Sequence, residues 1–193
     1  MMSFKNESYE GQTFQDLDCT KQDLSNREFL NCVFKKCDLS LANLSGSTFA
    51  DCTFSECNLT RVKVVNGSFQ EVVFDNCKLM GIAFANLKSK LLAWQFKNSL
   101  IELCAFTALQ MKLTEFHDCT IRETDFLNVD LTESDFTGSD LTRSRFKNAK
   151  LTKAKFVGAK NYYIDPSLNN VKGAKFSAPE VLSLLLPFGI EIE

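Results

Sequence analysis

The segment from Ser134 to Lys153 has the sequence SDFTG SDLTR SRFKN AKLTK, in which a large apolar residue recurs at every fifth position. A small residue lies two positions before each large one. An α-helix repeats its faces about every 3.6 residues and a β-strand about every 2, so a period of five fits neither element. Such a short, strict period indicates a repeat architecture. Each unit is predicted to turn one large and one small side chain inward.

The same period covers most of the chain. One run of large apolar residues extends from Leu24 to Phe84, and a second extends from Phe96 to Phe156. The slot two residues before them holds small side chains, such as Cys32 and Ala154. Because the period persists for so long, the chain is predicted to be a solenoid in which each coil contacts only its neighbours.

The repeat units resemble those of a known family. The stretches Ser134 to Gly138, Ser139 to Arg143 and Ala149 to Lys153 are similar to the A(D/N)Lxx repeat of the pentapeptide repeat proteins. The resemblance covers about residues 20 to 176 and implies an all-β fold, a right-handed quadrilateral parallel β-helix of roughly eight coils with about 20 residues in each. Residues 1–176 are assigned to this β-helix, with the first twenty as its starting cap, and residues 177–193 to a short C-terminal helical cap and tail.

The sequence offers no catalytic or metal-binding constellation. Seven of the eight cysteines occupy the small inward slot, which favours buried packing thiols; disulfides between stacked coils and metal binding are the alternatives. The single histidine, His117, is predicted to face outward, and no nucleophile, base or phosphate-binding motif accompanies it. We therefore expect no enzymatic activity, no cofactor and no metal. The polar start and the lack of a membrane-length apolar stretch predict a soluble, cytoplasmic protein.

Charge is distributed unevenly along the chain. Residues 1–80, 81–140 and 141–193 carry net charges of −3, −4 and +5, which together give the overall −2. The basic end could bind a partner, but residues 20 apart should stack, and six such pairs have opposite signs. This arrangement favours neutralisation between coils, and direct nucleic-acid binding is not expected because aromatic residues do not interleave the basic ones. The six pairs are Glu123/Arg143, Asp125/Arg145, Asp130/Lys150, Glu133/Lys153, Asp135/Lys155 and Asp140/Lys160.

The period breaks once. Phe84 and Phe96 are 12 residues apart instead of 10, so two extra residues enter within residues 85–95. This segment contains Lys88, Lys90 and the single tryptophan, Trp94. Two interpretations remain open: a kink filled by Trp94, or a bulge that contacts a partner.

The C-terminal segment changes character. Ser177 to Glu180 is predicted to be a capping box that opens a short helix, Gly189 should end it, and Ile190 to Ile192 could form a short strand. A helix that is apolar on several faces must be covered, so we expect it to cap the last coil and to form a homodimer; a cap folded only on its own chain is the alternative. The residues predicted to dimerise are Val181, Leu182, Leu184, Leu185, Leu186 and Phe188.

The whole pattern resembles the Qnr quinolone-resistance proteins and the microcin-immunity protein McbG. The shared features are the cysteine-rich first half, the mid-chain break, the Asp165-Pro166 turn and the apolar ending Phe188-Gly189-Ile190. The resemblance implies a non-catalytic DNA mimic that binds DNA gyrase or topoisomerase IV and protects it from quinolones or toxins, and the alternative is a rigid interaction scaffold of unrelated function. The candidate partner-binding residues are Asp51, Glu71 and Asp75, which lack a basic residue 20 positions away, together with Lys88, Lys90 and Trp94.

Overall fold

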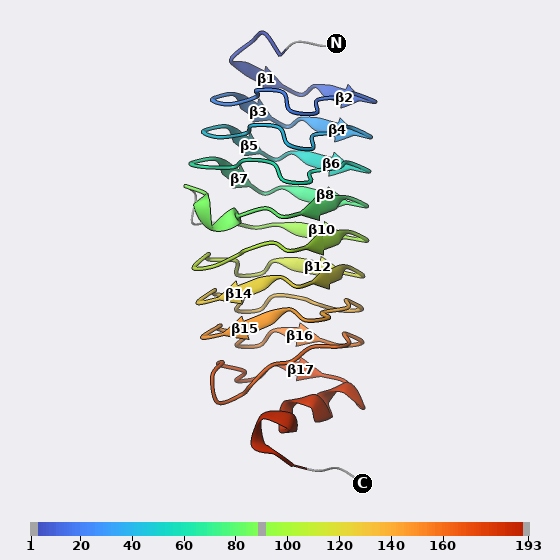
Figure 1. Cartoon of the computed structure of the whole chain (residues 1–193), viewed down its shortest axis with the longest axis vertical. Helices are drawn as coiled ribbons and strands as arrows, with labels where there is room; N and C mark the ends of the chain where they lie inside the picture. Colours follow the sequence, from blue (N-terminus) through green and yellow to red (C-terminus); the bar gives the residue numbers. More distant parts are fainter. Residues whose placement is uncertain (1–3, 89–91, 191–193) are drawn as a thin grey trace.

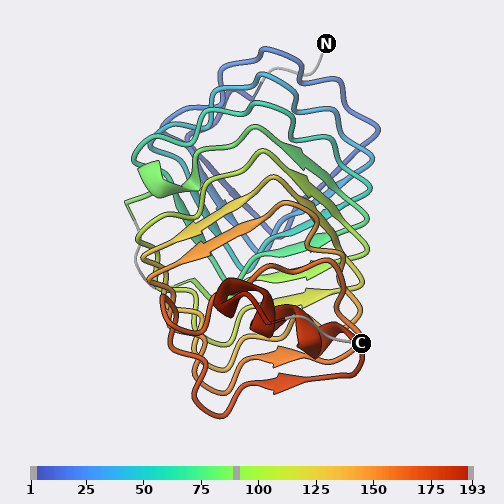
Figure 2. The ribbon, with the colours of Figure 1, turned by 60° about the horizontal axis from the view of Figure 1, so that its bottom comes forward.

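The chain winds into a parallel β-helix with four faces, as a computed structural model shows (Figures 1 and 2). The structure describes residues 4–88 and 92–190. We call the faces A to D in chain order, starting with the face that contains Tyr9. Strands are two or three residues long and end at corners, and each pairs in parallel with the strand one coil away. This architecture confirms the predicted quadrilateral solenoid.

The strands of each face occupy equivalent positions in successive coils. Face A holds β1 (Ser8–Glu10), β3 (Glu28–Leu30), β5 (Thr48–Ala50) and β7 (Ser68–Gln70). Face B holds β2 (Thr13–Gln15), β4 (Val33–Lys35), β6 (Thr53–Ser55), β8 (Val73–Asp75), β10 (Gln95–Lys97), β12 (Glu115–His117), β16 (Lys155–Phe156) and β17 (Lys175–Phe176). Face C holds β9 (Lys78–Met80), β11 (Leu100–Glu102) and β13 (Thr120–Arg122), and face D holds β14 (Asp125–Leu127) and β15 (Arg145–Lys147). Two 3-10 helices, η1 (Phe84–Asn86) and η2 (Glu180–Phe188), complete the fold.

A phenylalanine ladder fills the interior behind face B. Successive rings are stacked with centroids 4.7 to 5.3 Å apart, which is the spacing between coils. Stacked aromatic pairs add to the burial of apolar surface, so the ladder holds every coil to the next. Its members are Phe14, Phe34, Phe54, Phe74, Phe96, Phe116, Phe136, Phe156 and Phe176.

Several side chains in the small inward slot donate a hydrogen bond to the preceding coil. The thiols of Cys52 and Cys77 each donate to a carbonyl oxygen of the preceding coil at 3.3 Å, and the hydroxyl of Ser47 donates in the same way to Leu24 at 2.6 Å. The slot therefore accommodates a small side chain with one donor as well as an alanine, as at Ala154. All eight cysteines are buried and free, which confirms the packing interpretation. Burial raises the pKa of the Cys119 thiol to about 12, so this thiol is a poor nucleophile.

The corners place most fifth residues in the left-handed region. Leu113 has φ 61° and Asn76 has φ 52°, although neither is glycine. This conformation costs a non-glycine residue roughly 1–2 kcal/mol, and a β-branched side chain clashes most. Among the described residues with positive φ, none is Val, Ile or Thr. The ladder of backbone hydrogen bonds and the apolar interior must therefore hold the corners in place.

The two ends of the rod are closed differently. At the first coil, the ring of Phe4 turns over the interior and lies 5.1 Å from the ring of Phe14, while β1 and β2 already pair in the regular register. At the other end, η2 lies across the last coil (Figure 2). Residues 4–20 thus supply paired strands of the first coil as well as a cap.

The predicted capping box of the terminal helix is wrong. Helix η2 is a 3-10 helix that starts after Pro179 without a side-chain cap, and the Ser177 hydroxyl instead accepts a hydrogen bond from the Gly158 N–H at 2.9 Å. The contact of η2 with the last coil therefore takes the place of a local cap. Gly189 ends the helix at φ 65°, as predicted. The predicted strand after Gly189 extends into residues outside the described range.

Five of the six predicted ion pairs between coils form. They join Asp125 to Arg145 at 2.6 Å, Asp130 to Lys150 at 3.5 Å, Asp135 to Lys155 at 2.9 Å, Glu123 to Arg143 at 3.4 Å and Glu133 to Lys153 at 3.0 Å. The sixth is wrong, because Asp140 accepts a hydrogen bond from Asn161 at 2.8 Å and pairs with Arg122 at 3.8 Å. The basic stretch after residue 140 is thus largely neutralised by the preceding coil.

The phenylalanine ladder generates a first prediction. Replacing Phe54 by Ala should reduce the free energy of unfolding by about 3–5 kcal/mol, because a cavity replaces a fully buried ring between two stacked neighbours. Equilibrium unfolding in urea measures the loss. Phe54→Leu, which restores the large side chain used on other faces, should lose clearly less. Equal stability of Phe54→Ala and the wild-type protein would contradict the ladder.

The ion pairs generate a second prediction. Burial acts to raise the pKa of Asp135, but hydrogen bonds from Thr137 and Lys155 outweigh it and lower this pKa to about 2. A depressed carboxyl pKa contributes stability that is complete above the unfolded pKa of about 4 and is lost as the pH falls through about 2. Between these two pH values, the free energy of unfolding in urea should vary less with pH for the Asp135→Asn variant than for the wild-type protein. Identical pH profiles would count against this pair.

Candidate partner-binding surface

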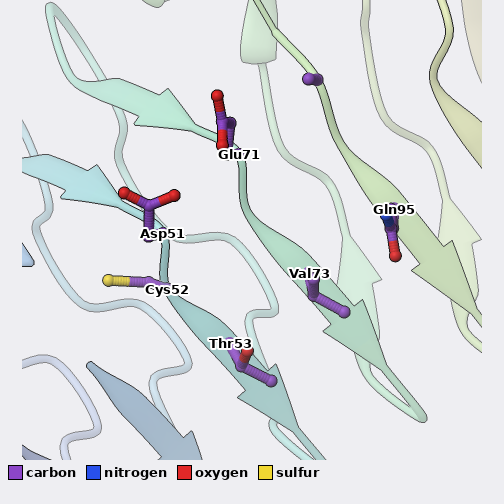
Figure 3. Close-up of a pocket in the computed structure, with 7 residues that line it drawn as sticks. Asp51, Cys52, Thr53, Glu71, Val73 and Gln95 are labelled. Carbon is purple, nitrogen blue, oxygen red and sulfur yellow. The ribbon is translucent and has the colours of Figure 1, made fainter. Parts of the chain in front are cut away.

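Two unneutralised carboxylates stack at the corner between faces A and B. Asp51 and Glu71 occupy equivalent positions in adjacent coils, each in the left-handed conformation with φ 53° and 50° (Figure 3). The Asp51 N–H donates to Gln70 of the next coil at 3.0 Å, which places the two corners next to each other. Both residues are exposed, and within the described part of the chain neither has a cation within 4 Å. This acidic corner matches the sequence prediction for these two residues.

A shallow hollow of about 330 Å³ opens beside the acidic corner. Figure 3 shows the two carboxylates at one side of it and Val73 and Gln95 on the neighbouring strands. Burial raises the pKa of the Cys52 thiol, which also lines the hollow, to about 11, so it is not a reactive group there. Carboxylates, one amide and a short apolar wall suit a Lys or Arg side chain that lays its stem on the wall.

Asp75 differs from the prediction. The two-residue insertion shifts the register, so that Asp75 of β8 lies opposite Lys97 of β10 instead of a residue 20 positions away. Its carboxylate also accepts a hydrogen bond from Asn98 at 3.5 Å. Asp75 therefore has a basic residue opposite it in the next coil, 22 positions away instead of 20, although no ion pair within 4 Å involves Asp75 among the described residues. The acidic corner itself consists of Asp51 and Glu71.

The frame break is absorbed without interrupting the rod. The Lys88 N–H bonds Gly67, 21 residues earlier, whereas the Gln95 N–H bonds Val72, 23 residues earlier. The two extra residues therefore enter between Lys88 and Gln95. The six-stranded sheet continues through β8, β10 and β12, so no kink separates the two halves (Figure 1).

Trp94 is not a surface residue. Its indole is completely buried, its Nε1–H donates to the Phe69 carbonyl at 3.0 Å, and its ring lies 5.2 Å from that of Phe84. It fills a slot that holds small side chains in other coils, so its assignment as a partner-binding residue is wrong. Lys88 is exposed next to the insertion, and Lys90 lies outside the described residues.

A second hollow lies on the same corner near the C-terminal end. It measures about 350 Å³ and is lined by Leu113, Glu133, Lys153, Lys155, Gly173 and Lys175. Lys153 and Lys155 already pair with Glu133 and Asp135. The corner therefore carries uncompensated acid in its first half and mainly paired charge in its second half.

The terminal helix leaves apolar side chains uncovered. No residue of η2 is buried, and Leu182, Leu186 and Phe188 are 42%, 57% and 55% exposed. Leu184 packs on the core of the rod, so it belongs to the cap. Val181 and Leu185 are half-buried, while Ile190, which the sequence prediction did not include, is 48% exposed. The exposed face is thus narrower than predicted and extends past Gly189.

The residues around the acidic hollow were only partly foreseen. Val73, Ala93 and Gln95 were not singled out, because an apolar, a small and an amide side chain give no signal of their own in a repeat. Val73 lies opposite Thr53 in the regular register, whereas the place of Ala93 and Gln95 depends on the shifted register, which the pattern of charges did not reveal. In the described residues, no helix is both long and apolar enough to cross a membrane.

Comparisons with known proteins match the architecture. Among solved structures, a trypsin-treated form of QnrB1, a plasmid-mediated fluoroquinolone resistance protein, superposes with a TM-score of 0.72 at 18% identity over 97% of this chain and 92% of that one. Full-length QnrB1 gives 0.51 at 17% identity over 95% and 100%. HetL of Nostoc sp. strain PCC 7120 gives 0.43 at 14% identity over 90% and 88%. None of the curated proteins matches this sequence.

These structural likenesses concern the fold, and a family model extends them to the sequence. The family model described as a pentapeptide repeat region matches residues 27–102 and 87–156 of this chain, which include the frame break and most of the coils. The match agrees with the five-residue period, the four-faced coil and the small inward slot. On this basis the chain belongs to the pentapeptide repeat family.

Proposed function

We propose that this protein binds a type II topoisomerase, DNA gyrase or topoisomerase IV, and protects it from quinolones or toxins. The observation that carries the proposal is the fold shared with QnrB1 over 97% of the chain, since QnrB1 is described as a fluoroquinolone resistance protein. The exposed acidic corner is the second support. Binding alone accounts for the activity, and it uses no cofactor.

The acidic corner supplies the contact with the enzyme. Duplex DNA presents one phosphate about every 3.4 Å along each strand, and enzymes bind it in cationic grooves. Stacked carboxylates at Asp51 and Glu71 recur at the coil spacing of about 4.8 Å, a coarser but similar line of negative charge. The hollow beside them accepts a Lys or Arg side chain of the groove. Occupation of the groove displaces DNA from the site at which the drug acts.

The scale of the charge favours a local contact. The net charge of the whole chain is −2, and five ion pairs neutralise the C-terminal half. DNA mimicry along the full rod would require many more uncompensated acids. We therefore infer that the enzyme contacts the corner of coils three to five, where Asp51 and Glu71 lie.

A supercoiling assay with gyrase and a quinolone tests the function. Purified protein should reduce cleaved plasmid and restore supercoiled plasmid in a dose-dependent manner. The variant Asp51→Asn/Glu71→Gln should require about tenfold more protein, because it loses two contacts worth roughly 0.7 kcal/mol each.

The matched control removes the same charge from another face. Asp18 and Asp38 also stack in adjacent coils, on face C, so Asp18→Asn/Asp38→Asn should protect like the wild-type protein. Equal loss in both variants would indicate a general charge effect and contradict the acidic corner. Inhibition of supercoiling without rescue would indicate that the protein competes with DNA and does not protect the enzyme. No effect on either activity would favour the scaffold function.

The proposal includes a homodimer through the C-terminal helix. The side chains of Leu182, Leu186 and Phe188 are exposed at the end of the rod, and a twofold contact would cover them. Replacing all three by Glu should abolish the end-to-end contact, so that small-angle scattering no longer detects particles about twice as long as one rod. Leu113→Glu, at an exposed leucine far from the helix, is the control. An unchanged particle length in the triple variant would overturn this contact.

A further inference from the structure

Face D, with its corner to face C, is the least charged side of the middle of the rod. Arg61 and Lys63 lie in coil three, and Glu123 and Asp125 lie three coils further along. Between them, the outward positions of this face and corner carry no charge in two successive coils. They are Gly81, Ala83, Ala85 and Asn86 in one coil and Leu103, Ala105, Thr107 and Ala108 in the next.

Backbone hydrogen bonds fix the order of these positions. Along the corner, backbone N–H groups donate to carbonyl oxygens of the next coil. The N···O distances are 2.7 Å from Arg61 to Met80, 2.9 Å from Gly81 to Glu102 and 3.1 Å from Leu103 to Arg122. Each N–H thereby lies beside the corner residue of the next coil, in the order Arg61, Gly81, Leu103, Glu123. On face D itself, parallel bridges join Ala83 to Ala105 and Ala105 to Asp125.

Two exposed apolar side chains lie on face D and its corner to face C. Leu103 is 54% exposed and holds a left-handed corner at φ 54°, and Val65 is 46% exposed. A leucine in that conformation costs free energy that its own chain does not recover, because half of its side chain faces water. Contact with another surface would recover it.

The charge pattern of face D is complementary to that of a second copy whose rod runs in the opposite direction. We propose that a second copy of this chain packs antiparallel against face D, about a twofold axis between the levels of Ala83 and Ala105. In this register Arg61 and Lys63 of one copy face Glu123 and Asp125 of the other. Leu103 of each copy lies over Gly81 of the other, beside the stem of Arg61, whose Cγ is 3.3 Å from the place of a Cβ at Gly81, and Val65 lies against Leu127.

The charge pattern selects a second copy and its direction. An isologous contact requires one surface to match itself after rotation, and here cations at one end meet acids at the other. A parallel arrangement would bring Arg61 and Lys63 of both copies to the same level, where like charges repel. A charge-free centre with charges at the margin is also the usual composition of a protein interface.

The acids remain accessible although they pair within the chain. Glu123 pairs with Arg143 at 3.4 Å, and Asp125 accepts two bonds from Arg145 at 2.6 and 2.7 Å. A carboxylate can accept further bonds from a second cation. In the proposed register, Arg143 and Arg145 face Leu41 and Asn43 of the second copy, so no cation meets a cation. The acidic corner with Asp51 lies diagonally opposite and stays free, which makes this contact independent of the proposed function.

Two charge-reversed variants test the contact by complementation. Arg61→Glu/Lys63→Glu and Glu123→Lys/Asp125→Lys should each weaken self-association about tenfold or more, because each brings like charges together twice. When the two variants are mixed, every reversed cation meets a reversed acid. The mixture should therefore associate as the wild-type protein does. Sedimentation velocity measures the mass, and the buried Trp94 reports by its fluorescence that each variant is folded.

A matched pair of leucines provides a test that leaves the ion pairs intact. Leu103→Lys should abolish the lateral dimer, whereas Leu113→Lys, at another exposed left-handed corner on the opposite side, should not change it. Small-angle scattering separates the two kinds of dimer, since a lateral pair is as long as one rod and an end-to-end pair is twice as long.

These outcomes decide the proposal. A lateral dimer that Leu103→Lys removes and the mixed variants restore would support it. A wild-type protein that forms no lateral pair at high concentration, or a mixture that does not restore this pair, would overturn it. An end-to-end dimer alone would leave the C-terminal contact standing, and protection of gyrase is measured separately.

Discussion

The stacking of one coil on the next in a single register holds this protein together. Strands of three residues are too short to be stable alone, and they persist because each bonds a strand above and a strand below. The phenylalanine ladder behind face B has the same spacing as the backbone ladder, so both favour the same register. Unfavourable left-handed corners, such as Leu113, are tolerated because the stack determines their conformation.

Stacking also turns a distance in sequence into a contact. A residue meets the one about 20 positions later, and each acidic position in the coil before residue 140 meets a base or an amide in the following coil. The first half lacks this compensation at Asp51 and Glu71, so their charge reaches the surface. A regular fold thus separates charges that stabilise the rod from charges that remain available for a partner.

The insertion shows how the stack responds to a defect. Two extra residues change the offset between coils from 20 to 22, yet β8 and β10 pair without a gap. Trp94 occupies an interior slot otherwise filled by small residues, and its indole N–H satisfies a carbonyl of the preceding coil. The bulk of the tryptophan compensates inside the rod for the altered path of the chain, which explains why a large aromatic residue is found at the break.

How much the sequence could predict follows from the period. Positions such as Phe54, Cys52 and the pair Asp135/Lys155 were predictable, because the length of one coil sets every contact between neighbouring coils at a constant offset. Asp75, Trp94 and the start of the terminal helix were not. Their surroundings depend on where two residues enter the coil and on contacts with the open end, and neither is periodic. By itself, the sequence determined the rod, its interior and its regular ion pairs, because local chain geometry repeats. Only the tertiary structure decided which acids stay unpaired, which large side chains are buried and how the charges of face D are ordered, because these depend on the register after the break.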